Sequence, residues 1–331
     1  MQDFYDSIQT WTEKKLTQRK AKKQYQKDHK TIKNEILSWV DALLFAVVVV
    51  FILNQFLFQL FVIPSPSMQN TLLIGDRVFV SKCTYGLEIF PYGPKILDSR
   101  SADRDDIITF YNPDYESKGT GFSILSRMLY MATFGLCNIE VDENGNPGEW
   151  LLVKRCAGKS GDTVTFRDGD AYIKPAGCST YIKETDFREE NGYVTAPKRE
   201  IKKDTYIAYK SLGRANGIQS VANKVSYIPK HLLNDYDGRD EKAFYTDYYG
   251  YEKWCSEGVR MADPCNADAR SEWTKKNLGL YVPEGCVLPL GDNRDNSTDG
   301  RYFGPVSEKT ITGFVASRIW PLSRISSLVN K

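Results

Sequence analysis

The feature that most constrains this chain is an uncharged apolar run near its N-terminus. Residues 42–63 (ALLFAVVVVFILNQFLFQLFVI) contain no Asp, Glu, Lys or Arg, and their only strongly polar side chains are Asn54, Gln55 and Gln59. A helix of that length, rising about 1.5 Å per residue, reaches about 33 Å, enough to cross the apolar core of a bilayer. A buried helix of a soluble core rarely stays uncharged this long, and a cleaved signal peptide would be shorter and end at a small-x-small site. We therefore predict a membrane-spanning helix over residues 39–63.

A cluster of basic residues precedes this run and indicates how the helix is oriented. It contains nine side chains: Lys14, Lys15, Arg19, Lys20, Lys22, Lys23, Lys27, Lys30 and Lys33. Because Lys and Arg gather on the cytoplasmic side of membrane helices, we expect residues 1–38 in the cytoplasm and everything after about Pro64 outside it. Beside a membrane span, attraction to anionic lipid is a better interpretation of the cluster than nucleic-acid binding, and we expect no nucleic-acid partner.

Beyond the apolar run, short β-rich segments alternate with turns rich in Gly, Pro and Asp. The clearest are RVFVSKCTY (77–85), DDIITFYNP (105–113), LLVKRC (151–156), TVTFRDGDAYIK (163–174), 282–291 and 313–320. Asp168-Gly169 inside the fourth segment is a strong hairpin signal. The pattern predicts a mainly β body made of residues 64–175 and 281–324.

Two stretches are predicted to be inserted into this body. Residues 114–149 include GFSILSRMLYMATFGLC (121–137), whose apolar residues recur at helical spacing through Ile124, Met128 and Met131. This favours a helix packed within the insert; shallow contact with the membrane surface is the alternative. Residues 176–280 are charged and rich in Tyr, and we interpret them as an α+β accessory subdomain of open role.

Seven cysteines follow the predicted span: Cys83, Cys137, Cys156, Cys178, Cys255, Cys265 and Cys286. Disulfides are permitted outside the cytoplasm, but an odd count leaves at least one thiol unpaired within the chain. Cys255 and Cys265 are the closest pair in sequence and the favoured one. The alternative is that most of these cysteines are small buried hydrophobes. Their spacing indicates no metal site.

Histidine is scarce in this chain, which has only His29 and His231. His29 lies before the predicted span, and His231 lies in the second insert outside any recognisable motif. A Ser-His-Asp triad is therefore hard to build, and a hydrolase of this sequence needs another base.

Two segments carry residues that can supply nucleophilic chemistry. In IPSPSM (63–68), two prolines stiffen the backbone around two serines, as a fixed nucleophile requires, although a plain membrane-exit linker has the same composition. In LLVKRC (151–156), Lys154 shares a strand face with Leu152. A lysine on a buried face loses hydration, its pKa falls, and its neutral amine can act as a base; a solvated strand end is the alternative.

The third segment, GDNRDNSTDGRYFG (291–304), is dense in charged and amide side chains. Asp295, Ser297 and Asp299 match the first positions of a calcium-binding loop. The position that needs Glu is Val306, however, and no flanking helices are evident, so we reject a calcium site. A polar network that orients catalytic groups is the better interpretation.

These segments, in this order behind a membrane anchor, resemble the sequence boxes of the bacterial type I signal peptidases, which are Ser/Lys-dyad serine proteases. PSPSM resembles the nucleophile box, GDRVFVSK (75–82) the next, and KR followed by GD (154–162) the base-lysine box. GDNRDNSTDGRYFG resembles the most distinctive box, and GFVASRIWPLSRI (313–325) is similar to the family's ending. The similarity covers about residues 40–112, 150–175 and 281–324.

The resemblance implies a role for each matching residue. Ser67 would be the nucleophile and Lys154 the general base. The Ser65 hydroxyl and the Ser67 backbone N–H would hold the oxyanion, and Ser297 would orient the lysine amine. Supporting charges would come from Arg155, Asp292, Arg294, Asp299 and Arg301, and walls of the substrate pockets from Met68, Leu72, Leu152 and Val153.

The sequence departs from the family pattern at three places near these residues. Pro66 stands where many members have glycine, Asn70 where proline is usual, and GKSGD (158–162) replaces a more apolar segment. These departures bear on fine substrate preference rather than on the mechanism.

The resemblance implies a single-pass protein of the bacterial cytoplasmic membrane that removes signal peptides from secretory preproteins, near the export translocon. It implies no metal or organic cofactor. One rival is a self-cleaving Ser/Lys regulator, which the membrane span argues against. Another is an inactive membrane-tethered binding protein, which the presence of both Ser67 and Lys154 argues against.

Overall fold

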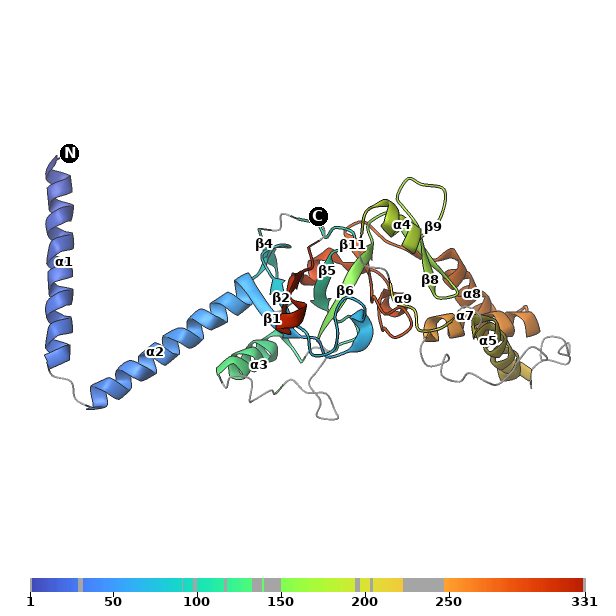
Figure 1. Cartoon of the computed structure of the whole chain (residues 1–331), viewed down its shortest axis with the longest axis horizontal. Helices are drawn as coiled ribbons and strands as arrows, with labels where there is room; N and C mark the ends of the chain where they lie inside the picture. Colours follow the sequence, from blue (N-terminus) through green and yellow to red (C-terminus); the bar gives the residue numbers. More distant parts are fainter. Residues whose placement is uncertain are drawn as a thin grey trace. The chain divides into compact units, whose positions relative to one another are not determined.

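The protein is described by a computed structural model that covers residues 2–28, 32–90, 92–97, 100–115, 118–132, 139, 150–193, 197–202, 205–222 and 247–329. The chain forms two compact units, Met1–Ile52 and Leu53–Lys331 (Figure 1). Each is described by itself below. His29, Cys137 and His231 lie outside the described residues.

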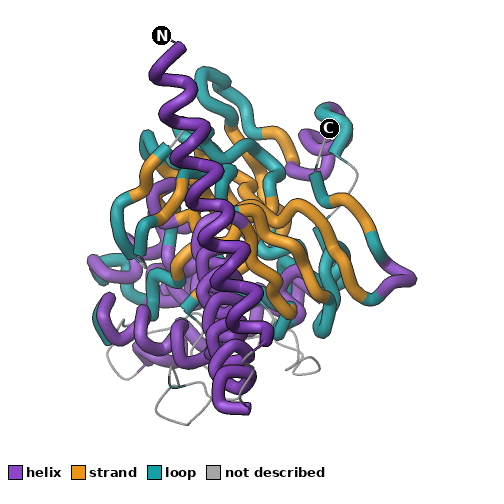
Figure 2. The backbone as a smooth tube through the Cα atoms, turned by 90° about the vertical axis from the view of Figure 1, so that its left-hand side faces the viewer, coloured by secondary structure: helices purple, strands orange, loops and turns teal. Residues whose placement is uncertain are grey.

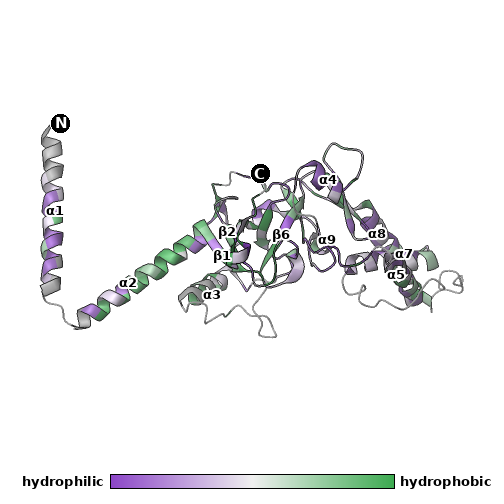
Figure 3. Ribbon diagram, viewed as in Figure 1, coloured by the Kyte–Doolittle hydropathy of each residue, from purple (hydrophilic) through white to green (hydrophobic). Residues whose placement is uncertain are grey.

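The first unit consists of two helices, α1 (Gln2–Asp28) and α2 (Ile32–Ile52). Helix α2 is apolar along most of its length (Figure 3) and continues through a π-turn to Leu57. Within the described part of the chain, Glu35–Leu57 is the one helix long and apolar enough to cross a membrane, and none of its apolar window is buried. Its length and composition agree with the predicted membrane anchor.

The predicted spanning helix was too long at its C-terminal end. Residues Phe58–Val62 form strand β1, which pairs antiparallel with β2 (Arg77–Ser81), so that Phe58 faces Ser81. Two contacts explain the change. The buried Gln55 side chain donates a hydrogen bond to the Glu88 carbonyl (3.2 Å), and the Phe58 ring stacks on Phe79. The polar residues of the run thus mark the point where the chain enters the body.

The second unit is built on a β-sheet, in agreement with the predicted mainly β body (Figure 2), and the strands of this sheet pair antiparallel. The order of its described strands is β1, β2, β13 (Ile311–Trp320), β5 (Ile107–Tyr111), β6 (Leu151–Gly158), β11 (Cys286–Leu290) and β12 (Val306–Ser307), and β14 (Ser326–Ser327) also pairs with β13. The register sets Lys154 of β6 opposite Ile108 of β5, and Leu290 of β11 opposite Arg155. The chain after Leu290 therefore emerges beside Lys154.

A second described sheet has the order β10 (Leu280–Tyr281), β7 (Thr163–Arg167), β8 (Asp170–Lys174) and β9 (Ile182–Lys183). The predicted hairpin joins β7 to β8, with φ of 52° at Asp168 and 73° at Gly169. Positive φ at both positions is the requirement of the tight turn that matches strand twist. Strands β3 (Leu87–Glu88) and β4 (Lys95–Ile96) form a separate small hairpin.

The apolar core of this unit reaches the predicted nucleophile loop. One buried cluster joins Ile63, Met68 and Leu72 to side chains of β2, β5 and β13. The segment that follows β1 is therefore fixed by packing on both sides of Ser67. A packed side chain keeps one rotamer and one backbone path, which a positioned hydroxyl needs.

The first insert contains helix α3 (Thr120–Ala132). The predicted helix is present, but Met128, expected on its packed face, is 52% exposed. Leu125 is also exposed, whereas Ser123 and Ser126 are buried and Ile124 is half-buried. Contact of the apolar side of α3 with a membrane stays a prediction.

The second insert contributes α4 (Glu184–Glu190), α5 (Thr205–Val221), α7 (Tyr248–Ala262) and α8 (Ala267–Leu278). Helix α5 packs on α7, and α7 on α8. A Cβ atom at Gly217 of α5 would lie 2.1 Å from the Cys255 carbonyl oxygen of α7, and one at Gly258 of α7 would lie 2.2 Å from the Arg214 carbonyl oxygen. Glycine at both positions lets the two helix backbones touch.

The predicted Cys255–Cys265 disulfide is not formed, and the six described cysteines are all free thiols. Cys255 lies within α7, and Cys265 follows three residues after the helix ends. From Cys255 to Ala262 the helix advances about 10 Å, beyond the roughly 7 Å that a disulfide allows between Cα atoms. Closeness in sequence was a poor guide because a helix separates the two residues.

Candidate active site

The predicted nucleophile loop is short and stiff. Ser65 is extended (φ −127°, ψ 159°), and Pro66 opens a single 3-10 turn over Pro66–Met68, closed by the Gln69 N–H on the Pro66 carbonyl (3.0 Å). The Met68 side chain is buried at the end of the turn, and Ser67 is 8% exposed. Proline supplies the helical φ of the turn, so this local sequence favours one backbone path past Ser67.

Ser67 and Lys154 meet in the structure although 87 residues separate them. The Lys154 Nζ donates a hydrogen bond to the Ser67 Oγ over 2.7 Å, and Lys154 is 3% exposed. The Ser65 and Ser67 hydroxyl oxygens lie 3.3 Å apart. A nucleophile and a base within about 2.6–3.2 Å are in position for direct proton transfer. The pair therefore has the geometry of a serine nucleophile beside an amine base.

Both residues of this pair line a cleft of about 510 Å³. Its walls come from residues 61–65, Ser67, Met68, Thr109 and 150–154. Of the predicted wall residues, Met68, Leu152 and Val153 line it, whereas Leu72 is fully buried in the same cluster as Met68. The cleft is thus mainly apolar and runs along the start of β6.

One side of β6 is unpaired along this cleft. Strand β11 pairs with β6 only at Arg155, Cys156 and Gly158, and among the described strands no other lies against that side of residues 151–154. Backbone N–H and C=O groups of an open strand edge are available to an added strand. The cleft can therefore accept an extended peptide.

The predicted orienting residue Ser297 lies near the nucleophile, and its hydroxyl makes no hydrogen bond within the described part of the chain, whereas its backbone carbonyl accepts one from Arg301 Nη2 (3.2 Å). Its Oγ is buried. A Cβ atom at Gly291 would lie 2.1 Å from this Oγ and 2.6 Å from the Ser67 carbonyl oxygen, so these two groups leave no space for a side chain at Gly291. Only glycine fits between them. The role of Ser297 toward the lysine amine stays a prediction.

Arg155, the residue after Lys154, forms a buried ion pair with Asp292. Arg155 donates from Nε to Asp292 Oδ1 (2.8 Å) and from Nη2 to Asp292 Oδ2 (2.7 Å), and the Thr71 hydroxyl donates to the same carboxylate. Asp105 lies 3.2 Å from Arg155 Nη1. Burial alone would raise the pKa of Asp292, but the charge and hydrogen bonds of Arg155 outweigh it and hold that pKa below its usual value. This pair ties β6 to the loops that carry Ser67 and Asn293.

We predict that Asp292→Asn lowers the free energy of unfolding by about 3 kcal/mol at neutral pH, because it removes one charge of a buried pair. A carboxylate whose pKa is depressed on folding stabilises the protein above its unfolded pKa of about 3.9, and this contribution disappears as pH falls through the folded pKa. The difference between wild type and variant should therefore be constant above about pH 5 and shrink below about pH 4. Urea unfolding of the full chain in detergent measures it.

The matched control for this prediction is Asp103→Asn. Asp103 also pairs with basic side chains, Arg100 (2.9 Å) and Lys159 (3.2 Å), but its side chain is 59% exposed. An exposed pair contributes at most about 1 kcal/mol. A loss for Asp292→Asn as small as that of the control, or one that does not change with pH, would contradict the account of the buried pair.

A second buried ion pair, between Arg301 and Asp299, lies within the segment 291–304. Arg301 donates from Nε to Asp299 Oδ1 (2.8 Å), and Asp299 Oδ2 accepts the Gly291 N–H (2.9 Å). Burial would raise the pKa of Asp299, but the charge of Arg301 overcomes this and lowers it.

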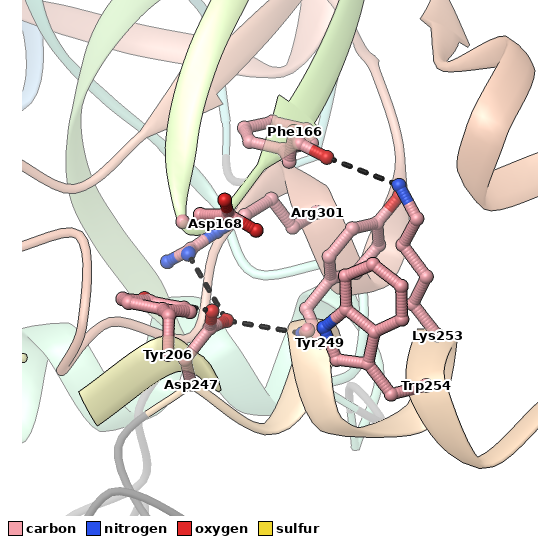
Figure 4. Close-up of a pocket in the computed structure, with 10 residues that line it drawn as sticks. Phe166, Asp168, Tyr206, Asp247, Tyr249, Lys253, Trp254 and Arg301 are labelled. Carbon is pink, nitrogen blue, oxygen red and sulfur yellow. Dashed lines mark hydrogen bonds and ion pairs between the residues drawn. The ribbon is translucent and has the colours of Figure 1, made fainter. Parts of the chain in front are cut away.

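Arg301 also lies 3.9 Å from Asp247 of the accessory insert, beside a cavity of about 10 Å³ that holds at most one water (Figure 4). This small cavity contains neither Ser67 nor Lys154.

The accessory insert contributes residues to the site that the sequence did not predict. The Lys198 N–H donates to the Asp292 carbonyl (2.7 Å), and the Lys198 carbonyl accepts the Arg294 N–H (3.1 Å). Helix α4 supplies Glu184, which pairs with the buried Arg294 over 2.7 Å. The local sequences of these residues carry no motif. No signal in the sequence pointed to these partners of Asp292 and Arg294.

Asn70 shows why the chain departs from the family pattern at this position. Its φ is 104°, a left-handed value that proline cannot adopt because its ring fixes φ near −65°. Asn is among the residues that tolerate positive φ. The loop after Met68 therefore follows a path that the usual proline would not permit.

The sequence matches the family described as signal peptidase, peptidase S26, over residues 36–320, most of the chain. This chain belongs to that family. It is 27% identical to signal peptidase I of Haemophilus influenzae over 87% of this chain and 70% of the relative. It is also 22% identical to signal peptidase IB of Staphylococcus aureus over 90% of this chain and 97% of the relative.

Among solved structures, a signal peptidase I from Enterococcus faecalis is 20% identical and covers 65% of this chain and 97% of that one. Its TM-score of 0.22 is too low to support any structural comparison. Membership of the family makes this S26 protein a serine endopeptidase of the signal peptidase I type. The predicted family and enzyme class are confirmed.

Proposed function

We propose that this S26 protein removes signal peptides from exported preproteins at the bacterial cytoplasmic membrane, with Ser67 as nucleophile and Lys154 as general base. The observation that supports this most is the 2.7 Å hydrogen bond between the two side chains, both of which line a mainly apolar cleft. An inactive tethered relative would have no need to keep both groups in reactive contact.

The proposed reaction is acyl transfer in two steps. Neutral Lys154 takes the proton of the Ser67 hydroxyl while the oxygen attacks the scissile carbonyl, and the Ser65 hydroxyl and Ser67 N–H hold the resulting oxyanion. The lysine ammonium then protonates the leaving amine, which departs as the new N-terminus of the mature protein. Water, deprotonated by Lys154, hydrolyses the ester and frees Ser67.

The substrate would lie extended along the unpaired edge of β6. Alternate side chains of an extended chain point to the same side, so two of the residues before the cut can enter the cleft between Met68, Leu152 and Val153. Apolar walls suit the uncharged end of a signal peptide. The purified chain in detergent should cut a preprotein that has alanines before its cleavage site, and N-terminal sequencing should place the cut after the last of them. A folded protein that leaves such a preprotein intact would refute the proposal.

We predict that the second unit lies outside the cytoplasm, close to lipid and to the point where preproteins emerge from the translocon. The basic residues of α1 precede the apolar helix Glu35–Leu57, which favours a cytoplasmic N-terminus. Protease added to intact spheroplasts should digest residues beyond Pro64, and a tag at the N-terminus should survive. Digestion of the body in inverted vesicles alone would show the opposite orientation.

A further inference from the structure

The residues that directly follow Met68 and Lys154 in the chain, Gln69 and Arg155, do not line the cleft. Apart from Thr109, its lining comes from two segments, residues 61–68 and 150–154, and Ser67 and Lys154 lie at the C-terminal limits of these segments. A peptide whose scissile carbonyl meets the Ser67 oxygen must therefore continue beyond the cleft on its other side. The apolar walls suit the signal peptide, so the first residues of the mature protein leave past the end of the nucleophile loop.

A cluster of polar side chains lies next to that end. Gln69, two residues after the nucleophile, accepts hydrogen bonds through Oε1 from Lys198 Nζ (3.0 Å) and Asn293 Nδ2 (3.4 Å). Glu200 Oε1 accepts from the same two groups, at 3.0 Å and 2.9 Å. Lys198 and Glu200 come from the accessory insert, and Gln69 and Asn293 from the two catalytic loops.

The cluster is fixed to the nucleophile through the backbone. The Asn293 N–H donates to the Ser67 carbonyl (3.0 Å), and Lys198 forms a parallel bridge with Asn293. The neighbouring Arg199 donates to Asp295 (3.0 Å), and the Glu200 N–H donates to the same carboxylate. Residues 198–200 of the accessory insert are thus bonded to residues 292–295 along several positions.

The two charged members of the cluster nevertheless remain open to solvent. Asn293 is fully buried, whereas the side chains of Lys198 and Glu200 are each 34% exposed. Hydrogen bonds from Asn293 and Lys198 hold the pKa of Glu200 below its usual value, so this carboxylate stays charged at neutral pH. A fixed cation and a fixed anion therefore face any chain that leaves the end of the cleft.

We propose that Lys198 and Glu200 of the accessory insert contact the first residues of the mature protein and set a charge preference after the cut. This inference rests on the proposed signal-peptide cleavage. Lys198 favours an acidic residue there and Glu200 a basic one, and the balance between them leaves the wild type tolerant of both. The accessory insert then serves substrate selection as well as the support of Arg294.

The test uses peptides that are identical before the cut and carry Glu, Gln or Lys at the first and second positions after it. Lys198→Ala should lower kcat/KM for the Glu peptide relative to the Lys peptide by about two- to fivefold, and Glu200→Gln should shift the ratio in the opposite direction. Both shifts should shrink in high salt, because the groups are partly exposed. The preference for residues before the cut should not change.

The matched control is Lys275→Ala, which breaks an exposed pair with Glu272 (2.8 Å) on α8 of the same insert and should leave the ratio unchanged. Opposite shifts in the two variants cannot come from a general loss of folding, which would affect all peptides alike. An unchanged Glu-to-Lys ratio in both variants would overturn this inference alone. A folded wild type that cuts none of the peptides would overturn the proposed function together with it.

Discussion

Lys154→Arg is expected to abolish preprotein cleavage while the protein stays folded. The variant keeps the positive charge, but a guanidinium does not deprotonate at working pH and cannot take the proton of Ser67. We expect kcat to fall at least about a thousandfold, as when one member of a catalytic unit is lost. The measurement is single-turnover cleavage of a preprotein, with folding checked by thermal melting.

Lys253→Arg is the matched control for this prediction. Lys253 is also a buried lysine, with its Nζ on the Phe166 carbonyl over 3.2 Å (Figure 4), but it lies in the accessory insert away from Ser67. Its replacement introduces the same bulk into a buried site and should leave most of the activity. If Lys154→Arg turned over at a rate close to that of Lys253→Arg, a neutral lysine base would be ruled out.

Ser67→Ala is expected to have an equally large effect through loss of the nucleophile. The hydroxyl accepts the hydrogen bond from Lys154, and its removal leaves the backbone turn Pro66–Met68 intact, so stability should change by no more than about 1 kcal/mol. The double variant with Lys154→Arg should be no slower than either single one, because the two groups act as a unit. Full additivity of the two losses would contradict a shared step.

Ser126→Ala is the control for the loss of a buried hydroxyl. Ser126 lies on α3, is 2% exposed and belongs to no part of the site. Preprotein cleavage by this variant should match the wild type.

The sequence predicted the strands well because their signal is local. Runs of β-branched and aromatic residues mark β2 and β5, and Asp168-Gly169 marks the β7–β8 turn through the positive φ that both residues accept. The sequence also singled out Ser67 and Lys154 as the candidate pair, since their boxes stand out from the surrounding chain, and their catalytic roles stay predictions. Their contact in the structure follows from the pairing of β6 with β5 and β11.

The parts that the sequence did not predict depend on contacts between distant residues. The run up to Ile63 is uncharged throughout and apolar apart from Asn54, Gln55 and Gln59, and pairing with β2 makes its end a strand. Glu184 and Lys198 lie in ordinary polar sequence, and their importance comes from the buried groups Arg294 and Asn293, about a hundred residues away. No local pattern records such partners.

The most direct test of the Ser/Lys mechanism is to detect the acyl-enzyme. A peptide substrate is mixed with the full chain, the reaction is stopped with acid within one turnover, and the intact mass of the denatured protein is measured. The account predicts a mass increase equal to the part of the peptide before the cut, carried as an ester on Ser67 and absent from Ser67→Ala. Cleavage by the wild type with no such adduct, or an adduct that persists in Ser67→Ala, would contradict it.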